Sequence, residues 1–193
     1  MSRRRLVPRS FYARPPDVVA PELLNKILIG PNGSGRIVEV EAYDGVRDPA
    51  SHAYRGLTPR NSVMFGPPGY LYVYFTYGMH WCANAVCRED GDAAAVLLRA
   101  IAPIDGLDLM RAARKVTRDR DLGSGPGKLC QALGIGAAHY GVDLTRRASA
   151  VRIVDDGVAP PTAPVVSRRV GLTVGVEQPW RWYVASDVHV SRK

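Results

Sequence analysis

The chain has 193 residues, of which 46% are apolar and 23% are charged. These proportions are typical of a globular protein and argue against a disordered chain. The length suits one domain with a continuous core. No run approaches the roughly 18 consecutive apolar residues that a membrane helix requires, so we expect no membrane partner.

The formal net charge of +8 comes from 22 arginines and four lysines against 18 acidic residues. Arginine pairs well with phosphate and stacks on aromatic rings, so a nucleic-acid partner is plausible, although charge alone does not establish one. Three cysteines without CxxC spacing argue against a disulfide framework and a zinc site, and the four histidines are scattered. We therefore expect no metal and no cofactor.

The first 15 residues are basic, and we expect a flexible N-terminal arm there, followed by one folded domain over residues 16–193. No apolar stretch follows the positive charges, so the arm does not look like a secretory signal. We expect a monomer in the cytoplasm, associated with the nucleoid if the source is a bacterium.

Apolar patterns and turn residues predict more strands than helices. The predicted helices cover residues 21–28, 107–114 and 128–133, and Asp105 is the expected cap of the second. The predicted strands cover residues 27–29, 36–43, 70–77, 81–87, 93–101, 151–154, 169–174 and 181–184. The strands at 70–77 and 81–87 form a hairpin with its tip at 78–80, and 44–68 is a long loop of the kind that often carries function. Strands in runs with few helices between them indicate an α+β fold with a largely antiparallel sheet.

Side chains alternate along the predicted strand at 36–43. Glu39, Glu41 and Tyr43 fall on one face, because strand side chains point to opposite faces at every second residue. The opposite face is apolar and carries Val38, Val40 and Ala42. Two carboxylates and a ring on an apolar strand must face water, a basic partner or a cavity that uses them.

Five residues could together form a site for a planar base: Glu41, Tyr43, His52, Tyr74 and Arg99. A base taken out of a duplex needs flat faces to stack between and a polar group to read its edge, and the carboxylate could activate water. Each residue also has an ordinary interpretation, as an ion pair, a turn residue or one face of a core. Tyr77 is harder to explain in this way, because a large ring at a glycine-containing tip exposes apolar surface unless a partner covers it.

Four long motifs resolve the ambiguity: RIVEVEAYDGVRDPASHAYRG, TPRNSVMFGPPGYLYVYFTYGMHWCANAV, AAAVLLRAIAPIDGL and DLGSGPGKLCQALGI. Together they closely resemble the 3-methyladenine DNA glycosylases of the alkyladenine glycosylase family. The resemblance runs from about residue 21 to the end of the chain and is weakest after residue 144. It implies one DNA glycosylase domain with a curved antiparallel sheet, peripheral helices and a protruding hairpin that enters the minor groove of DNA.

The resemblance also implies catalytic roles. Glu41 in VEAY looks like the general base, and Arg99 in LLRA looks like its partner in holding the attacking water. The carbonyl of Val170 in RRVG would complete that water site. The implied reaction is hydrolysis of the N-glycosidic bond, which leaves an abasic site. An alkylated purine departs as a neutral base and needs little acid assistance, so activating the water is the main task.

Other matching residues would bind the damaged nucleotide and the duplex. The walls of the base pocket correspond to Tyr43, His52 and Tyr74, and Asn84 holds the position that crowds the amino group of normal guanine. Tyr77 in TYGM corresponds to the intercalating wedge, with Met79 beside it. The implied partner is double-stranded DNA that contains 3-methyladenine or related lesions.

Two other functions stay open at this point. The chain could be a non-catalytic nucleic-acid-binding module in which Glu41 is structural, or a hydrolase that acts on free nucleosides. Tyr77 at a hairpin tip favours duplex DNA over a nucleoside, and Glu41 together with Arg99 favours catalysis over binding. No lysine is placed as an imine-forming nucleophile, so we expect a monofunctional enzyme without strand-cleaving lyase activity.

Overall fold

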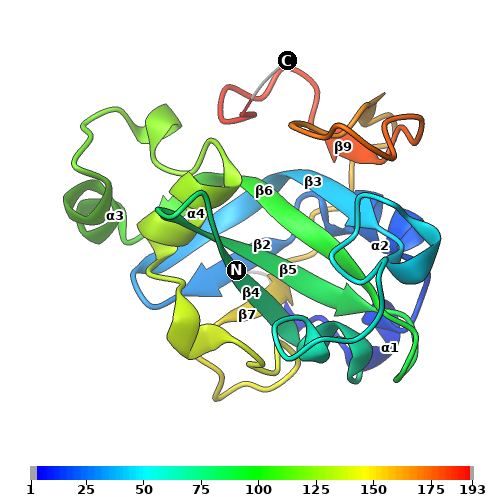
Figure 1. The fold of residues 1–193 in the computed structure, drawn as a ribbon. Coiled ribbons are helices and arrows are strands. Elements are labelled where there is room, and N and C mark those ends of the chain that lie inside the picture. The colour runs from blue at the N-terminus through cyan, green and yellow to red at the C-terminus, as the bar shows by residue number, and fades with distance from the viewer. Residues whose placement is uncertain (1–3, 192–193) are drawn as a thin grey trace.

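The computed structural model describes residues 4–191, and its main element there is a curled sheet of nine antiparallel strands (Figure 1). The strand order is β1-β7-β2-β3-β6-β5-β4, while β9 pairs with the second half of β3 and also with β8. The expected fold class is confirmed: an α+β domain with a curved antiparallel sheet, peripheral helices and a protruding hairpin. Within the same residues, no helix is long and apolar enough to cross a membrane.

The strands are β1 (Arg5–Leu6), β2 (Ile27–Gly30), β3 (Gly33–Tyr43), β4 (Leu71–Thr76), β5 (His80–Cys87), β6 (Ala94–Asp105), β7 (Arg152–Asp155), β8 (Val165–Ser167) and β9 (Arg181–Tyr183). The α-helices are α1 (Arg9–Tyr12), α2 (Pro16–Leu23), α3 (Leu107–Arg114) and α4 (Pro126–Leu133). Short 3₁₀ turns lie at Gly45–Arg47, Ser62–Phe65, Asp119–Asp121 and Ala137–His139. Helices α2 and α4 pack against the central strands, and the main core lies between them and the sheet.

The described part of the expected N-terminal arm belongs to the folded domain. Strand β1 pairs with β7, and the side chains of Val7 and Tyr12 are buried in the main core. Arg9 donates to Asp143 at 2.6 Å. Apolar residues between the arginines thus anchor residues 5–12 on the domain, the expected boundary at residue 16 stays a prediction, and residues 1–3 lie outside the described residues.

Helix α2 runs over Pro16–Leu23 rather than over the predicted residues 21–28. Proline suits the first position of a helix because that position needs no backbone donor, and Pro16 starts α2 in this way. Asn25, with a φ of 67°, then turns the chain into β2. Because of Pro16 and Asn25, the helix lies five residues closer to the N-terminus than predicted.

The pairing of β3 with β6 contains two register shifts that matter for the site. Glu39 is paired with Ala100 and Val40 with Leu98, so Arg99 is an extra residue on β6, and Val38 is correspondingly extra on β3. A bulge re-aims the side chain of the extra residue, and here it directs Arg99 toward the two glutamates of β3.

The same irregularity divides the apolar face of β3. Val40 and Ala42 lie in the main core as predicted, but Val38 lies in a separate small cluster with Ala100 and Val190. The prediction that all three share one face is wrong for Val38, because the bulge interrupts the alternation.

The β4–β5 hairpin protrudes with Tyr77, Gly78 and Met79 at its tip. Tyr77 has a φ of 51° and Gly78 a φ of 65°, and the amide of Met79 donates to the carbonyl of Thr76 at 3.2 Å. Two central residues with positive φ match the twist of a two-stranded ribbon. The two predicted strands of the hairpin are confirmed to within one residue at each end. The tip lies at 77–79 rather than at the predicted 78–80, because His80 is already in β5.

Two further predictions need correction. Asp105 ends β6, and Gly106, with a φ of 81°, takes the cap position before α3. The strand predicted at 169–174 is absent from the described residues, where β8 covers Val165–Ser167 instead. Gly171 and Gly175 have φ values of 76° and 62°, which favour the loop that the chain forms there.

Candidate active site

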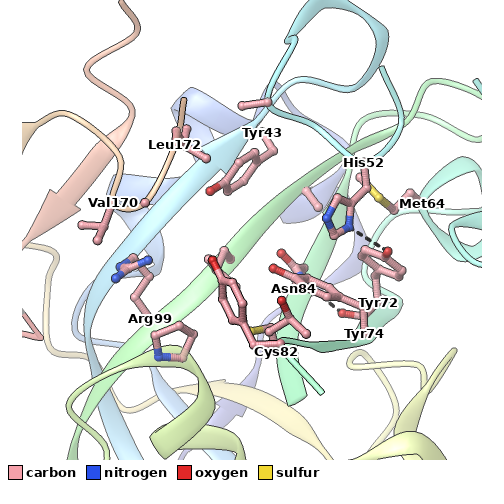
Figure 2. A pocket seen from close by; sticks show the side chains of 17 residues that line it. Tyr43, His52, Met64, Tyr72, Tyr74, Cys82, Asn84, Arg99, Val170 and Leu172 are labelled. Atoms are coloured by element: carbon pink, nitrogen blue, oxygen red, sulfur yellow. Dashed lines mark hydrogen bonds between the residues drawn. The ribbon is translucent and has the colours of Figure 1, made fainter. Parts of the chain in front are cut away.

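A cavity of about 390 Å³ opens between β3, β4, β5 and β6, close to the base of the hairpin (Figure 2). That volume is within the range of pockets that bind small ligands. The other walls come from the loop that contains His52, from the start of α4 at Pro126 and from residues 170–172. In Figure 2, Arg99 and Val170 lie at one end of the cavity and His52 and Tyr72 at the other, with Tyr43 between them.

Aromatic side chains form much of the cavity wall. The rings of His52 and Tyr74 meet edge to face with their centroids 4.4 Å apart, and Tyr72 stacks on Tyr74 at 5.5 Å. Nδ1 of His52 lies 3.0 Å from the hydroxyl of Tyr72, which fixes the plane of the imidazole. Tyr43 faces the cavity from β3. Tyr72 and Tyr74 of β4 therefore line the cavity, while Leu71 and Val73 of the same strand point into the main core.

These walls are electrically neutral at physiological pH. Burial raises the pKa of the Tyr43 and Tyr74 hydroxyls, and burial also raises the pKa of Tyr72 to about 12. The pKa of His52 is lowered from 6.5, first by burial and then by the charge of Arg60. A neutral imidazole among protonated tyrosines presents ring faces and hydrogen-bonding edges without a net charge.

Asn84 lies at the floor of the cavity on β5 and is almost fully buried. Its amide nitrogen donates to the carbonyl of Tyr72 at 3.1 Å across the β4–β5 pair. The side chain is thus held by the backbone, which gives the floor a fixed shape.

Glu41 lies directly behind the cavity wall with no exposed surface. Its Oε2 accepts a hydrogen bond from the Tyr43 hydroxyl at 2.8 Å, and its Oε1 accepts one from the amide of Val170 at 2.7 Å. Nη1 of Arg99 lies 3.2 Å from the same Oε1. Two hydrogen-bond donors and one guanidinium thus converge on one buried carboxylate, and each of the three residues that supply them also lines the cavity.

A second carboxylate, Glu39, lies behind Arg99. Its Oε1 accepts from Nε of Arg99 at 2.7 Å and from Nε of Arg181 at 2.8 Å, and its Oε2 accepts from the amide of Ser191 at 2.7 Å. Burial opposes the ionisation of Glu39, but Arg99, Ser191 and Arg181 outweigh that effect and hold its pKa below the usual value. In Figure 1, β9 and the segment that follows it lie together beside β3 and β6, where these contacts form.

An ion pair between Asp48 and Arg169, both without exposed side-chain surface, joins two loops around Tyr43. Arg169 also donates to the carbonyls of Ala42 at 2.9 Å and Gly175 at 2.8 Å, and its guanidinium carbon lies 4.6 Å from the centre of the Tyr43 ring. The pair therefore fixes Tyr43 from behind and holds the loop that brings the amide of the next residue, Val170, to Glu41.

The hairpin tip stands above the cavity and is open to solvent. Tyr77 is 81% exposed and Met79 is 67% exposed, and Tyr77 also lines the cavity mouth. Below the tip, Phe75 packs on Trp81 with ring centroids 4.8 Å apart. Arg60 donates to the carbonyl of Phe75 at 3.1 Å. The base of the hairpin is thus braced, while its apolar tip has no cover within the described residues.

The structure brings the predicted site residues together around one cavity. Seven of them line it, namely Tyr43, His52, Tyr74, Tyr77, Asn84, Arg99 and Val170. Glu41 touches three of these from behind, and Met79 stays at the tip, outside the lining. Val170 presents its amide to Glu41, so the role expected for its carbonyl stays a prediction. Within residues 4–191, His, Cys, Asp and Glu side chains form no group of three that could hold a metal.

Several residues that shape the site are not among the predicted site residues. Tyr72 lies two residues before Tyr74 on the same strand, and that spacing could have placed it in the cavity wall. Glu39 shares a face with Glu41, and that spacing could have placed it in the site. Arg181 and Ser191 gave no such signal, because their contacts join distant parts of the chain.

The fold and the cavity define an α+β protein with a deep aromatic pocket that is backed by a buried pair of carboxylate and guanidinium. The chain belongs to the methylpurine-DNA glycosylase family, whose sequence profile matches residues 10–188. The family resemblance that the motifs indicated is therefore confirmed.

Relatives of similar length carry the name "Putative 3-methyladenine DNA glycosylase". The protein of Burkholderia cenocepacia strain HI2424 is 57% identical over 188 residues, which cover 96% of this chain and 91% of the relative. The protein of Rhodopseudomonas palustris strain BisB18 is 49% identical over 184 residues, with 95% and 90% covered. That of Chlorobaculum tepidum is 46% identical over 187 residues, with 94% and 88% covered.

Proposed function

We propose that this protein is a monofunctional DNA glycosylase that removes 3-methyladenine and related alkylated purines from duplex DNA. It hydrolyses the N-glycosidic bond and leaves an abasic site. Membership of the methylpurine-DNA glycosylase family and the names of the relatives support the substrate class. The observation that carries the chemistry is the position of Glu41, a buried carboxylate that touches Tyr43, Arg99 and Val170 at one end of an aromatic cavity.

The cavity suits a cationic planar base. Alkylation at N3 or N7 of a purine gives it a positive charge, and the faces of the Tyr43 and Tyr74 rings attract a cation. The neutral state of His52 avoids a repulsive charge beside that base. A damaged base also costs less to unstack than a sound one, so flipping contributes to selection.

Glu41 would activate the attacking water through Oε2. A carboxylate oxygen can accept two hydrogen bonds, and two groups already face Oε1: the Val170 amide, which donates to it, and the charged Nη1 of Arg99 at 3.2 Å. Oε2 accepts only from Tyr43 among the described residues, which leaves it one acceptor position. Deprotonating water in this way contributes typically about 10²- to 10⁴-fold in rate, and the negative charge also stabilises the oxocarbenium-like transition state.

Tyr77 would fill the gap that the flipped nucleotide leaves in the duplex. Apolar side chains inserted from the minor groove act as such wedges. The exposure of Tyr77, its left-handed backbone and its place at the cavity mouth fit that role. A non-glycine residue with positive φ is strained, and such strain is often kept at functional sites.

The cavity supports hydrolysis rather than an amine-dependent lyase reaction. Its lining residues in the described part of the chain include no lysine. Lys26, the most buried lysine there, pairs with Asp155 at 2.7 Å beside β2 and β7, outside the cavity lining. Water held by Glu41 is therefore the proposed nucleophile.

The test is incubation of the protein with three substrates: duplex DNA methylated with dimethyl sulfate, the same DNA as single strands, and the free nucleoside 3-methyldeoxyadenosine. We expect release of 3-methyladenine from the duplex, intact strands with abasic sites, and little reaction of the nucleoside. Binding without release would point to a non-catalytic module, and equal turnover of the nucleoside would remove the duplex from the proposal. Strand cleavage without added base would contradict monofunctional hydrolysis.

A further inference from the structure

Arg99 is shared between two buried carboxylates. Its Nε lies 2.7 Å from Glu39, whereas its Nη1 lies 3.2 Å from Glu41. Arg99 is the extra residue of a β-bulge, so it has no partner residue directly opposite on β3. The two carboxylates therefore fix the direction of its side chain. Glu39 therefore holds the guanidinium in the orientation in which it meets Glu41.

Two buried carboxylates and two nearly buried guanidinium groups lie in one cluster. Glu39 and Glu41 are fully buried, and the side chains of Arg99 and Arg181 are 7% and 6% exposed. Arg181 contacts Glu39 at 2.8 Å, and the amide and hydroxyl of Ser191 donate to Glu39 at 2.7 and 2.9 Å. These contacts keep Glu39 ionised, and in a site with little water its charge acts strongly on Arg99 and on Glu41.

We propose that Glu39 is a positioning residue that sets the basicity of Glu41 through Arg99. Without Glu39, the full charge of Arg99 would act on Glu41 and make it a poorer proton acceptor. With Glu39 in place, Arg99 still orients Glu41 but is largely neutralised by the nearer carboxylate. Arg181 tunes the arrangement in the opposite direction, because it competes with Arg99 for Glu39. The inference rests on the proposed role of Glu41 as the general base.

Charged and titratable groups on several elements face this cluster. They are Arg99 on β6, Arg181 on β9, Tyr43 beside Glu41 on β3, Arg169 behind Tyr43, and Tyr74 and Cys82 on the cavity side. Burial raises the pKa of Tyr43, Tyr74 and Cys82, so these three stay neutral across the acid range. The acid limb of the reaction therefore does not report on these three groups.

The experiment measures single-turnover release of 3-methyladenine from methylated duplex DNA as a function of pH. The methylated base is already cationic, so its departure needs no proton and the acid limb reports on the protein. Glu39→Gln should move this limb to lower pH by about one unit, the low end of the effect of a nearby charge. Arg181→Gln should move it to higher pH by a similar amount. The double variant loses one charge of each sign and should return close to the wild-type profile.

Controls separate this effect from damage to the fold. Asp143→Asn removes a partly buried carboxylate that pairs with Arg9 outside the cavity, and it should leave the profile unchanged. Thermal melting shows which variants fold, and if Glu39→Gln does not fold, the upward shift in Arg181→Gln decides alone. A purely structural role would lower the rate without moving the limb in opposite directions.

Unshifted limbs in the folded variants, or shifts of the same sign, would overturn the inference. Glu41→Gln is measured in the same assay. If that variant excises normally, the proposed chemistry of Glu41 fails, whatever the Glu39 profiles show. If it loses activity while the Glu39 and Arg181 profiles match the wild type, only the tuning role fails.

Discussion

Replacing Glu41 with glutamine removes the charge of the proposed base while preserving most of its contacts. The amide oxygen can accept from the Val170 amide and from Arg99, and the amide nitrogen can donate to the oxygen of Tyr43. Arg99 keeps its closer partner Glu39, so no guanidinium is left unpaired. We expect the free energy of unfolding to fall by about 2 kcal/mol at most, since the contacts of residue 41 persist but become neutral.

For a domain of this size, such a loss lowers the melting temperature by roughly 8 °C at most. The chemical step should lose at least about 10²-fold, which corresponds to about 2.7 kcal/mol in the barrier. Single-turnover excision and a melting curve on the same preparation measure both quantities. Glu22→Gln, on a partly exposed glutamate that pairs with Arg14, is the matched control and should change neither. Near-normal excision by folded Glu41→Gln would remove Glu41 from the chemistry.

Three further outcomes follow from the structure. Tyr77→Ser should weaken formation of the flipped complex about tenfold, measured by the fluorescence of a reporter base. The melting temperature should not change, because the exposed ring has few contacts to lose. Undiminished flipping would exclude Tyr77 as the wedge. Arg169→Lys has three donors on a single nitrogen, so it cannot reproduce the two-point pairing with Asp48 together with both carbonyl bonds. It should destabilise the protein by about 3 kcal/mol and lower excision at least tenfold. A stable, active variant would show that the ion pair does not position Tyr43. The pKa of Glu39 in the folded protein is below its usual 4.5. The stability that the ionised Glu39 contributes is therefore present above pH 4.5 and is lost as the pH falls through the folded-state pKa. Melting temperatures of Glu39→Gln should depend less on pH below 4.5 than those of the wild type.

The local parts of the site could be predicted from the sequence because their signals are local. Alternation placed Glu41 and Tyr43 on one face of a strand, and the glycine after Tyr77 marked the hairpin tip. The motifs then supplied Arg99 and Val170, which lie far from Glu41 in the chain. These predictions needed only strand periodicity, turn chemistry and a resemblance.

The rest depended on tertiary contacts that no local pattern encodes. The bulge at Val38 and Arg99 arises from the pairing of two strands, so the alternation rule failed at Val38. The apolar residues around Gly171 predict a strand. The backbone instead bends there into a loop that brings the amide of Val170 to Glu41. Ser191 reaches Glu39 only when β9 has docked beside β3.

The last of these contacts has a consequence for the order in which the protein is assembled. The hairpin of Tyr77 joins neighbours in the chain, whereas the contact between Ser191 and Glu39 closes a separation of 152 residues. Closing a long loop costs more entropy and is slower, so the hairpin of Tyr77 should form before the contact between Ser191 and Glu39. In pulsed hydrogen exchange during refolding, amides of β4 and β5 should gain protection before the Ser191 amide, and simultaneous protection would contradict this order. A chain caught between the two stages would already have the hairpin that we propose enters DNA, while the contacts around Glu39 and Glu41 are still incomplete.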